Sequence, residues 1–179
     1  MRIIGGKHRS RMLAEFAGED VRPTSDRAKE ALFNILSFAV RGARVLDLFA
    51  GSGALGLESL SRGAREAVFN DASKASIAIV KKNIATLKEE NVRIYNYDFS
   101  VCLDAVQGQF DIVFIDPPYS QEYGAQALKK IAERGLLTKD GIAVYERDRP
   151  FDGEVLGLEK YDERRYGKAY FTFFRSAKE

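Results

Sequence analysis

The residues with the clearest chemical potential follow a run of apolar side chains. The segment FDIVFIDPPY (110–119) is typical of a buried strand that ends in Asp116-Pro117-Pro118-Tyr119. Open α/β sheets bind ligands at the carboxyl ends of their strands. There, Asp116 and the carbonyl of Pro117 could accept the two hydrogens of an amine on a planar base, and Tyr119 could stack on the ring. The alternative is a proline-rich turn with a surface tyrosine.

A second candidate site is the glycine-rich segment DLFAGSGALG (47–56). It places Gly51 and Gly53 directly after an expected strand and at the start of an expected helix. Glycines let the backbone approach a ligand closely, and a helix N-terminus offers free N–H groups. Asp71 stands 20 positions after Gly51, where a carboxylate can accept hydrogen bonds from both hydroxyls of a ribose. The pattern suits NAD as well as S-adenosylmethionine, and a tight turn without a ligand is a third reading.

Two further carboxylates favour S-adenosylmethionine. Asp47 ends a strand just before the glycines, where it would face the cationic end of a sulfonium-bearing amino acid; a dinucleotide would place its pyrophosphate there. Asp98 ends another strand and could reach the amino group of an adenine, although an Asp at that place is also a common N-cap. No metal is expected, because one His and one Cys are too few for a structural zinc site.

The elements that must position these residues alternate along the chain. Apolar periodicity predicts strands at 43–49, 66–71, 92–98, 110–116 and 141–147, with helices between them, and a strand pair within 153–175. Such alternation is typical of right-handed crossovers and a parallel sheet covered on both faces. We therefore predict an α/β, Rossmann-like, doubly wound fold with a mostly parallel seven-stranded sheet. It should carry a C-terminal antiparallel hairpin and a small N-terminal β-hairpin appendage.

The N-terminus differs from this core in its charge. We divide the chain into a basic extension, residues 1–23, and a main domain, residues 24–179. Residues 1–11 contain four cations and no acid, which indicates either a solvated face or a surface that contacts phosphates. The cations of the extension considered for such contacts are Arg2, Lys7, Arg9, Arg11 and Arg22.

Composition limits the remaining choices. The 179 residues are 45% hydrophobic and carry 28 Lys and Arg against 26 Asp and Glu, which excludes a disordered chain. The lone Cys102 cannot form an internal disulfide and suits a reducing cytoplasm. Without a run of 18 apolar residues, no membrane partner is expected, and a monomer is the expected state.

Several of these motifs together resemble a known family. DLFAGSGALGLESLSRGA, the acidic end of AVFND and DPPY resemble class I S-adenosylmethionine-dependent methyltransferases that act on amino groups. RIIGGKHRSRML and RPTSDRAKEALFNIL narrow the resemblance to the RsmD-type 16S ribosomal RNA guanine-N(2) methyltransferases. The family usually has an aliphatic residue and then Glu where this chain has Asn70-Asp71, which leaves open which of these two residues contacts the ribose.

The resemblance implies direct methyl transfer to the amine of a flipped guanine. The substrate would be 16S ribosomal RNA, either free or in an assembling small subunit. Asp116, Pro117 and Tyr119 would hold the guanine, and Asp47, Gly51, Gly53, Asp71 and Asp98 would hold S-adenosylmethionine. The basic N-terminal hairpin would meet the RNA.

Three other functions share parts of these motifs. A DNA adenine or cytosine amino-methyltransferase also carries DPPY, but it would need a target-recognition region for which 179 residues leave little room. An NAD-dependent oxidoreductase would use the same glycine-rich turn. A non-catalytic RNA-binding protein on the same fold would have no need to keep both Asp116 and Tyr119.

Overall fold

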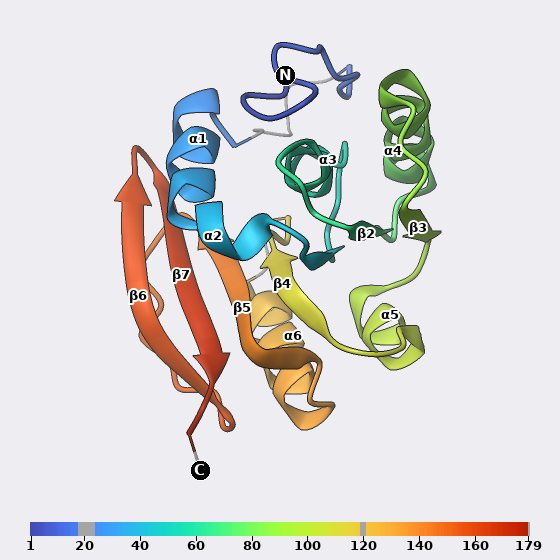
Figure 1. Cartoon of the computed structure of the whole chain (residues 1–179). Coiled ribbons are helices and arrows are strands. Elements are labelled where there is room, and N and C mark those ends of the chain that lie inside the picture. The colour runs from blue at the N-terminus through green and yellow to red at the C-terminus, as the bar shows by residue number, and fades with distance from the viewer. Residues whose placement is uncertain (18–23, 119–120, 179) are drawn as a thin grey trace.

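The computed structural model describes residues 1–17, 24–118 and 121–178 (Figure 1). Its helices are α1 (Asp26–Ile35), α2 (Ser37–Val40), α3 (Ala54–Ser61), α4 (Lys74–Leu87), α5 (Phe99–Ala105) and α6 (Gln121–Glu133). Its strands are β1 (Arg44–Asp47), β2 (Glu66–Asn70), β3 (Val92–Tyr95), β4 (Phe110–Ile115), β5 (Leu137–Arg147), β6 (Leu158–Tyr166) and β7 (Ala169–Ser176). Within these described ranges, no helix is both long and apolar enough to cross a membrane.

The strands form one seven-stranded sheet in the order β3-β2-β1-β4-β5-β7-β6. Strands β1 to β5 run parallel to one another, and β7 runs antiparallel to both β5 and β6. The predicted α/β fold with a mostly parallel sheet and a C-terminal antiparallel hairpin is therefore confirmed. The central strand β4 is apolar along nearly its whole length because helices cover both faces of the sheet.

The helices divide between the two faces of the sheet. Apolar side chains of α5 and α6 pack on one face, and those of α1 to α4 pack on the other. Strands β2 and β3 lie on one side of β1 in the sheet, whereas β4 and β5 lie on its other side. The carboxyl ends of β1 and β4 therefore flank the topological switch point of the sheet, where open α/β proteins bind ligands.

Local sequence signals explain most element boundaries. Ser25 caps α1 by accepting a hydrogen bond from the Ala28 N–H at 3.1 Å, and Ser73 caps α4 in the same way. Strand β5 begins at Leu137, four residues before the predicted start at Gly141. The register between β4 and β5 shifts there, and a Cβ on Gly141 would lie only 2.9 Å from the Phe110 carbonyl oxygen. A glycine at this irregularity lets the two strands stay paired.

The predicted N-terminal β-hairpin is present only in a short form. A single antiparallel bridge joins Arg2 to Met12, and no strand extends from it within residues 1–17. The Ile3 N–H donates to the Arg11 carbonyl and the Leu13 N–H to the Met1 carbonyl, both at 2.9 Å, whereas the next N–H groups along the chain bind α3. Those of Ile4 and Gly5 donate to the carboxylate of Glu58.

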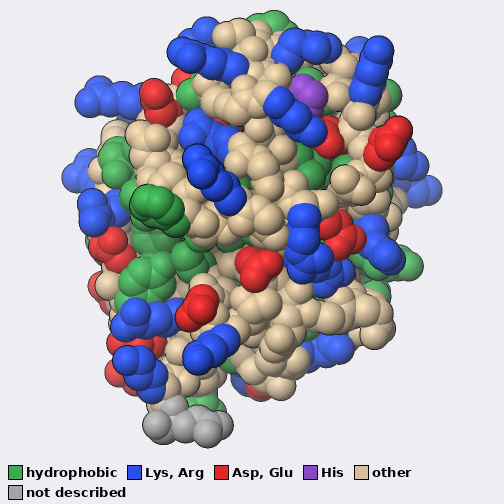
Figure 2. Space-filling view, in the orientation of Figure 1, with side chains coloured by type: hydrophobic (Ala, Val, Ile, Leu, Met, Phe, Trp, Pro, Cys, Tyr) green, Lys and Arg blue, Asp and Glu red, His purple; other side chains and the backbone are tan. Residues whose placement is uncertain are grey.

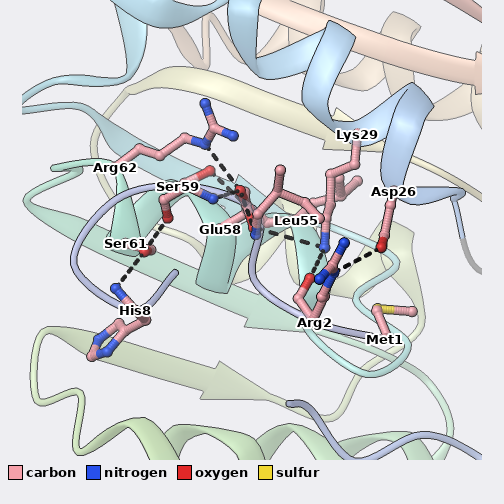
Figure 3. A network of polar contacts seen from close by, with 12 residues as sticks. Met1, Arg2, His8, Asp26, Lys29, Leu55, Glu58, Ser59, Ser61 and Arg62 are labelled. Carbon is pink, nitrogen blue, oxygen red and sulfur yellow. Dashed lines mark hydrogen bonds and ion pairs between the residues drawn. The ribbon is translucent and has the colours of Figure 1, made fainter. Parts of the chain in front are cut away.

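A buried polar network anchors this N-terminal loop to α3 and α1 (Figure 3). Glu58 is fully buried and also accepts a hydrogen bond from Arg62 Nε at 2.9 Å. The ammonium of Lys29, on α1, is buried beside it, 3.7 Å from Glu58 and 2.7 Å from the Arg2 carbonyl oxygen. Burial lowers the pKa of Lys29. With Ile3 and Leu13 in the hydrophobic core, the loop packs as part of the main body.

Candidate functional site

A cavity of about 1370 Å³ opens at the switch point of the sheet. The turn after β1, including Gly51, lines one end of it, and Asp116 to Pro118 line the end after β4. The start of α1 and the turn between β6 and β7 form further walls. Single small-molecule sites usually measure roughly 300–1,000 Å³, so this cavity has room for two ligands side by side.

Asp71 holds the glycine-rich turn in place. One of its carboxylate oxygens accepts a hydrogen bond from the Gly51 N–H, and the other accepts one from the Ser73 N–H, both at 2.9 Å. Gly51 has φ +58°, a conformation that favours glycine. Asp71 lines the cavity, whereas Asn70 is buried and its side-chain amide donates to the Leu48 and Tyr97 carbonyls. Of the two neighbours, Asp71 is the one that lines the cavity, and its contact with a ribose stays a prediction.

Gly53 supports the turn from behind. It caps α3 with φ +85°, and a Cβ on it would face the core side chains of Phe69, Leu57 and Val80 at 3.4–3.5 Å. The residue does not line the cavity, whose wall here is formed by Ala50, Gly51 and Ser52. Gly53 therefore shapes the turn, and its contact with a bound donor stays a prediction.

Asp98 also lies outside the residues that line the cavity. Its exposed carboxylate accepts a hydrogen bond from the Ser100 N–H at 3.0 Å and caps α5. The structure thus shows the capping role that an Asp before a helix commonly has. Contact with an adenine stays a prediction.

Asp47 is a buried acid at the floor of the cavity. Its side chain lies at the end of β1, is only 2% exposed and accepts a hydrogen bond from the Gly56 N–H at 3.0 Å. No cation pairs with it among the described residues. Burial raises the pKa of Asp47 to about 7, against the effect of the Gly56 N–H. A cationic ligand in the cavity would favour the ionised form of this carboxyl.

Asp116 lies across the switch point from Asp47 and is hydrogen-bonded to a second acid. Its partner is Glu146, at the end of the neighbouring strand β5, and both line the cavity. Thr24 Oγ1 lies 2.8 and 3.1 Å from the two carboxylate oxygens of Glu146 and donates to that group. Burial raises the pKa of both acids, and for Asp116 the charges of Glu146 and Asp47 add to the effect. Two acids in hydrogen-bonded contact share a proton, so the pair can take up or release one.

Sequence reasoning did not single out Glu146. It belongs to the predicted strand GIAVYER, and that strand ends at the same edge of the sheet as Asp116. The parallel register pairs Ile115 with Tyr145, which places the next residue of each strand side by side. The sequence signal that could have identified Glu146 as a candidate site residue was an acid at the carboxyl end of a predicted parallel strand.

Two predicted residues, Tyr119 and Arg22, lie outside the described residues. Pro117 lies where predicted, in the cavity wall next to Asp116. No group of three or more His, Cys, Asp or Glu side chains in the described part of the chain could hold a metal ion.

The N-terminal cations lie on the surface, and Figure 2 shows Lys and Arg side chains gathered over the N-terminal loop. Arg2 pairs with Asp26 at 3.1 Å, beside the start of α1. Lys7 pairs with Glu89 at 2.9 Å, and an Arg11 Nη donates to the Thr86 carbonyl at 3.1 Å, both at the end of α4. Arg9 is exposed.

Comparison with known proteins now identifies the family. The family model described as "Conserved hypothetical protein 95" matches residues 1–175. Ribosomal RNA small subunit methyltransferase D of Haemophilus influenzae is 40% identical over 157 residues, which cover 84% of this chain and 81% of that protein. The protein of the same name from Escherichia coli is 38% identical over 148 residues, or 83% and 75% of the two chains. The structure of the Escherichia coli protein yhhF superposes with a TM-score of 0.86 at 33% identity and covers 99% of each chain. This chain therefore belongs to the "Conserved hypothetical protein 95" family and is an RsmD-type methyltransferase.

Proposed function

We propose that this chain transfers a methyl group from S-adenosylmethionine to the exocyclic N2 amine of a guanine in 16S ribosomal RNA. The observation that carries the proposal is one large cavity with a glycine-rich turn and two acids at one end and Asp116-Pro117 at the other. The relatives named ribosomal RNA small subunit methyltransferase D support the class of RNA. Asp116 and the Pro117 carbonyl, which can accept two amine hydrogens, favour an exocyclic amine such as N2 of guanine as the acceptor.

The donor end of the cavity fits S-adenosylmethionine on chemical grounds. Asp71 presents a carboxylate beside the Gly51 N–H, which suits the hydroxyls of a ribose. Asp47 is a buried carboxyl with one backbone hydrogen bond and no cation beside it in the described ranges. The sulfonium and ammonium groups of the donor would supply that missing positive charge. When bound, the donor supplies an electrophilic methyl group on a good leaving group.

The acceptor end positions the amine and removes its proton. Asp116 and the Pro117 carbonyl would accept the two hydrogens of the amine and turn its lone pair toward the methyl group. A bond forms between nitrogen and carbon, the carbon–sulfur bond breaks, and the amine then carries an acidic proton. The hydrogen-bonded pair of Asp116 and Glu146 would accept that proton. We assign stacking on the extruded base to Tyr119.

The partner in this proposal is 16S ribosomal RNA, free or in an assembling small subunit. The protein acts as a monomer in the cytoplasm. Residues 1–23 serve as the RNA-contacting extension, and residues 24–179 serve as the catalytic domain. Arg2, Lys7, Arg9, Arg11 and Arg22 provide contacts that depend on salt but not on base identity.

Calorimetry and a transfer assay together test the proposal. S-adenosylmethionine should bind, and NAD should not; binding of NAD alone would support the oxidoreductase. Methyl transfer from labelled donor to transcribed 16S ribosomal RNA should exceed transfer to duplex DNA of the same length. Asp116→Ala should lose most turnover and keep donor binding, while Asp104→Ala, which removes a surface acid on α5, should match the parent. Near-normal turnover of Asp116→Ala would remove the mechanism.

A further inference from the structure

Among the described N-terminal cations, Lys7, Arg9 and Arg11 do not line the cavity. Helices α3 and α4 start at the carboxyl edge of the sheet and run away from it. The Lys7 N–H donates to the carbonyl of Ser61, the last residue of α3, and its ammonium pairs with Glu89, beyond the end of α4. At 1.5 Å per residue, α3 is about 12 Å long and α4 about 21 Å long. Lys7 and its neighbours therefore lie at the opposite ends of these helices from the proposed reaction.

Other cations surround the cavity itself. Arg27 of α1, Arg165 of β6 and Lys168 of the turn between β6 and β7 line it together with Asp116 and Pro117. We call Arg27, Arg165 and Lys168 the acceptor rim. All three side chains are exposed, and no carboxylate pairs with any of them in the described part of the chain. This differs from Arg2 and Lys7, which both pair with acids.

The β6–β7 turn holds one rim residue in a fixed position. Arg165 Nε donates to the Gly167 carbonyl at 2.9 Å, and its guanidinium lies 5.3 Å from the centre of the Tyr170 ring. These two contacts use one N–H and one face of the group. The remaining N–H groups stay available for a phosphate, and less side-chain entropy is lost when they bind it.

Most of the carboxylates of the cavity lie in its buried part, and most of the cations lie at its exposed edge. Asp47, Asp71, Asp116 and Glu146 line the floor and are buried or half-buried. Arg27, Arg165 and Lys168 are exposed at the edge, together with the acids Glu15 and Asp148, and Arg147 is half-buried. Phosphates would be repelled from the floor and attracted to the edge, while an uncharged base can enter between them. This arrangement suits a nucleotide whose backbone stays outside while its base turns inward.

We propose that the acceptor rim holds the phosphodiester backbone next to the extruded nucleotide. Lys7 and Arg9 contact other parts of the RNA, away from the reacting nucleotide. The inference rests on the proposed function, since it requires an RNA substrate. It places the contacts that govern productive binding on α1 and the C-terminal hairpin, which lie far apart in the sequence but form one wall of the cavity.

The test compares three double variants on transcribed 16S ribosomal RNA. They are Arg165→Gln with Lys168→Gln in the rim, Lys7→Gln with Arg9→Gln in the N-terminal loop, and Lys129→Gln with Lys139→Gln as a charge-matched control on exposed positions. The measurements are kcat/KM, its dependence on salt, and calorimetric binding of S-adenosylmethionine. Donor binding reports that the cavity is intact.

The rim pair should lower kcat/KM by about three- to tenfold per lost contact and reduce the log–log salt slope by roughly 0.7–0.9 per contact. The N-terminal pair should change both quantities less than the rim pair, and donor binding should be unchanged in all three variants. A parental salt slope in the rim pair, or a larger loss in the N-terminal pair, would overturn the inference. If the parent transfers no methyl group to this RNA, either free or assembled into small-subunit particles, the proposed function itself fails; if the parent is active and the rim variants behave like it, the assignment of the rim fails.

Discussion

Replacing Asp47 by Asn should stabilise the ligand-free protein, and more so as the pH rises. Asp47 is 2% exposed, and its folded-state pKa of about 7 lies above the unfolded value of 3.8. A raised pKa means that the folded state binds more protons than the unfolded state between pH 3.8 and 7. The parent therefore loses stability as the pH rises through this window.

The magnitude follows from the difference between the two pKa values. One unit is worth about 1.4 kcal/mol, so full ionisation of Asp47 costs about 4 kcal/mol of unfolding free energy. Linkage gives a cost of roughly 1.7 kcal/mol at pH 5 and roughly 4 kcal/mol at pH 7.5. The advantage of Asp47→Asn over the parent should therefore grow by about 2.5 kcal/mol between these two pH values.

Urea denaturation of both proteins at pH 5 and pH 7.5 measures this difference. Asp152→Asn, on an exposed loop, serves as a control and should stay within about 0.5 kcal/mol of the parent. Saturating S-adenosylmethionine should stabilise the parent more at pH 7.5 than at pH 5, because binding a cation favours ionised Asp47, and should stabilise Asp47→Asn much less. An advantage of Asp47→Asn that is the same at both pH values would refute the reasoning.

Four further changes test other parts of the structure. Glu58→Ala leaves the ammonium of Lys29 buried without its acid and should cost about 3–5 kcal/mol of unfolding free energy, whereas Glu133→Ala on the surface of α6 should cost at most about 0.5. Gly53→Val, at φ +85° against the core, should lower the denaturation midpoint, while loss of donor affinity with parental stability would show that Gly53 faces the ligand. Asp98→Ala should cost about 1 kcal/mol as a lost N-cap, and calorimetry tells whether S-adenosylmethionine affinity also falls, as an adenine contact requires. Glu146→Gln should lower kcat and shift its pH profile while donor affinity holds; a parental pH profile would exclude Glu146 from the pair that takes the proton.

The fold could be predicted because its signals are local. Strands such as β1 and β4 are short apolar runs bounded by turn residues, and the helices between them show regular apolar spacing. The parallel order then follows from the alternation of elements. Asp47, Asp71 and Asp116 could be placed at one edge because each lies at or near the carboxyl end of a predicted strand.

What could not be predicted depends on contacts between distant segments. Nothing in the pattern of α3 shows that Glu58 is fully buried and binds the N-terminal backbone, and so the expected hairpin is present only in a short form with one bridge. Glu146 was hidden in a charged stretch, and its pairing with Asp116 comes from the register of β4 and β5. The role of Asp98 could not be decided from the sequence, because an N-cap and a ligand contact both favour an Asp at that position.

Identification of the methylated nucleoside tests the central claim most directly. Transcribed 16S ribosomal RNA, which carries no methyl groups, would be incubated with the protein and labelled S-adenosylmethionine, both free and assembled into small-subunit particles. The RNA would then be digested to nucleosides, which are separated by mass. The account predicts a single product, N2-methylguanosine, formed by the parent and strongly reduced with Asp116→Ala. Label in adenosine or cytidine, on a ring position of guanosine, or in no nucleoside at all would contradict it.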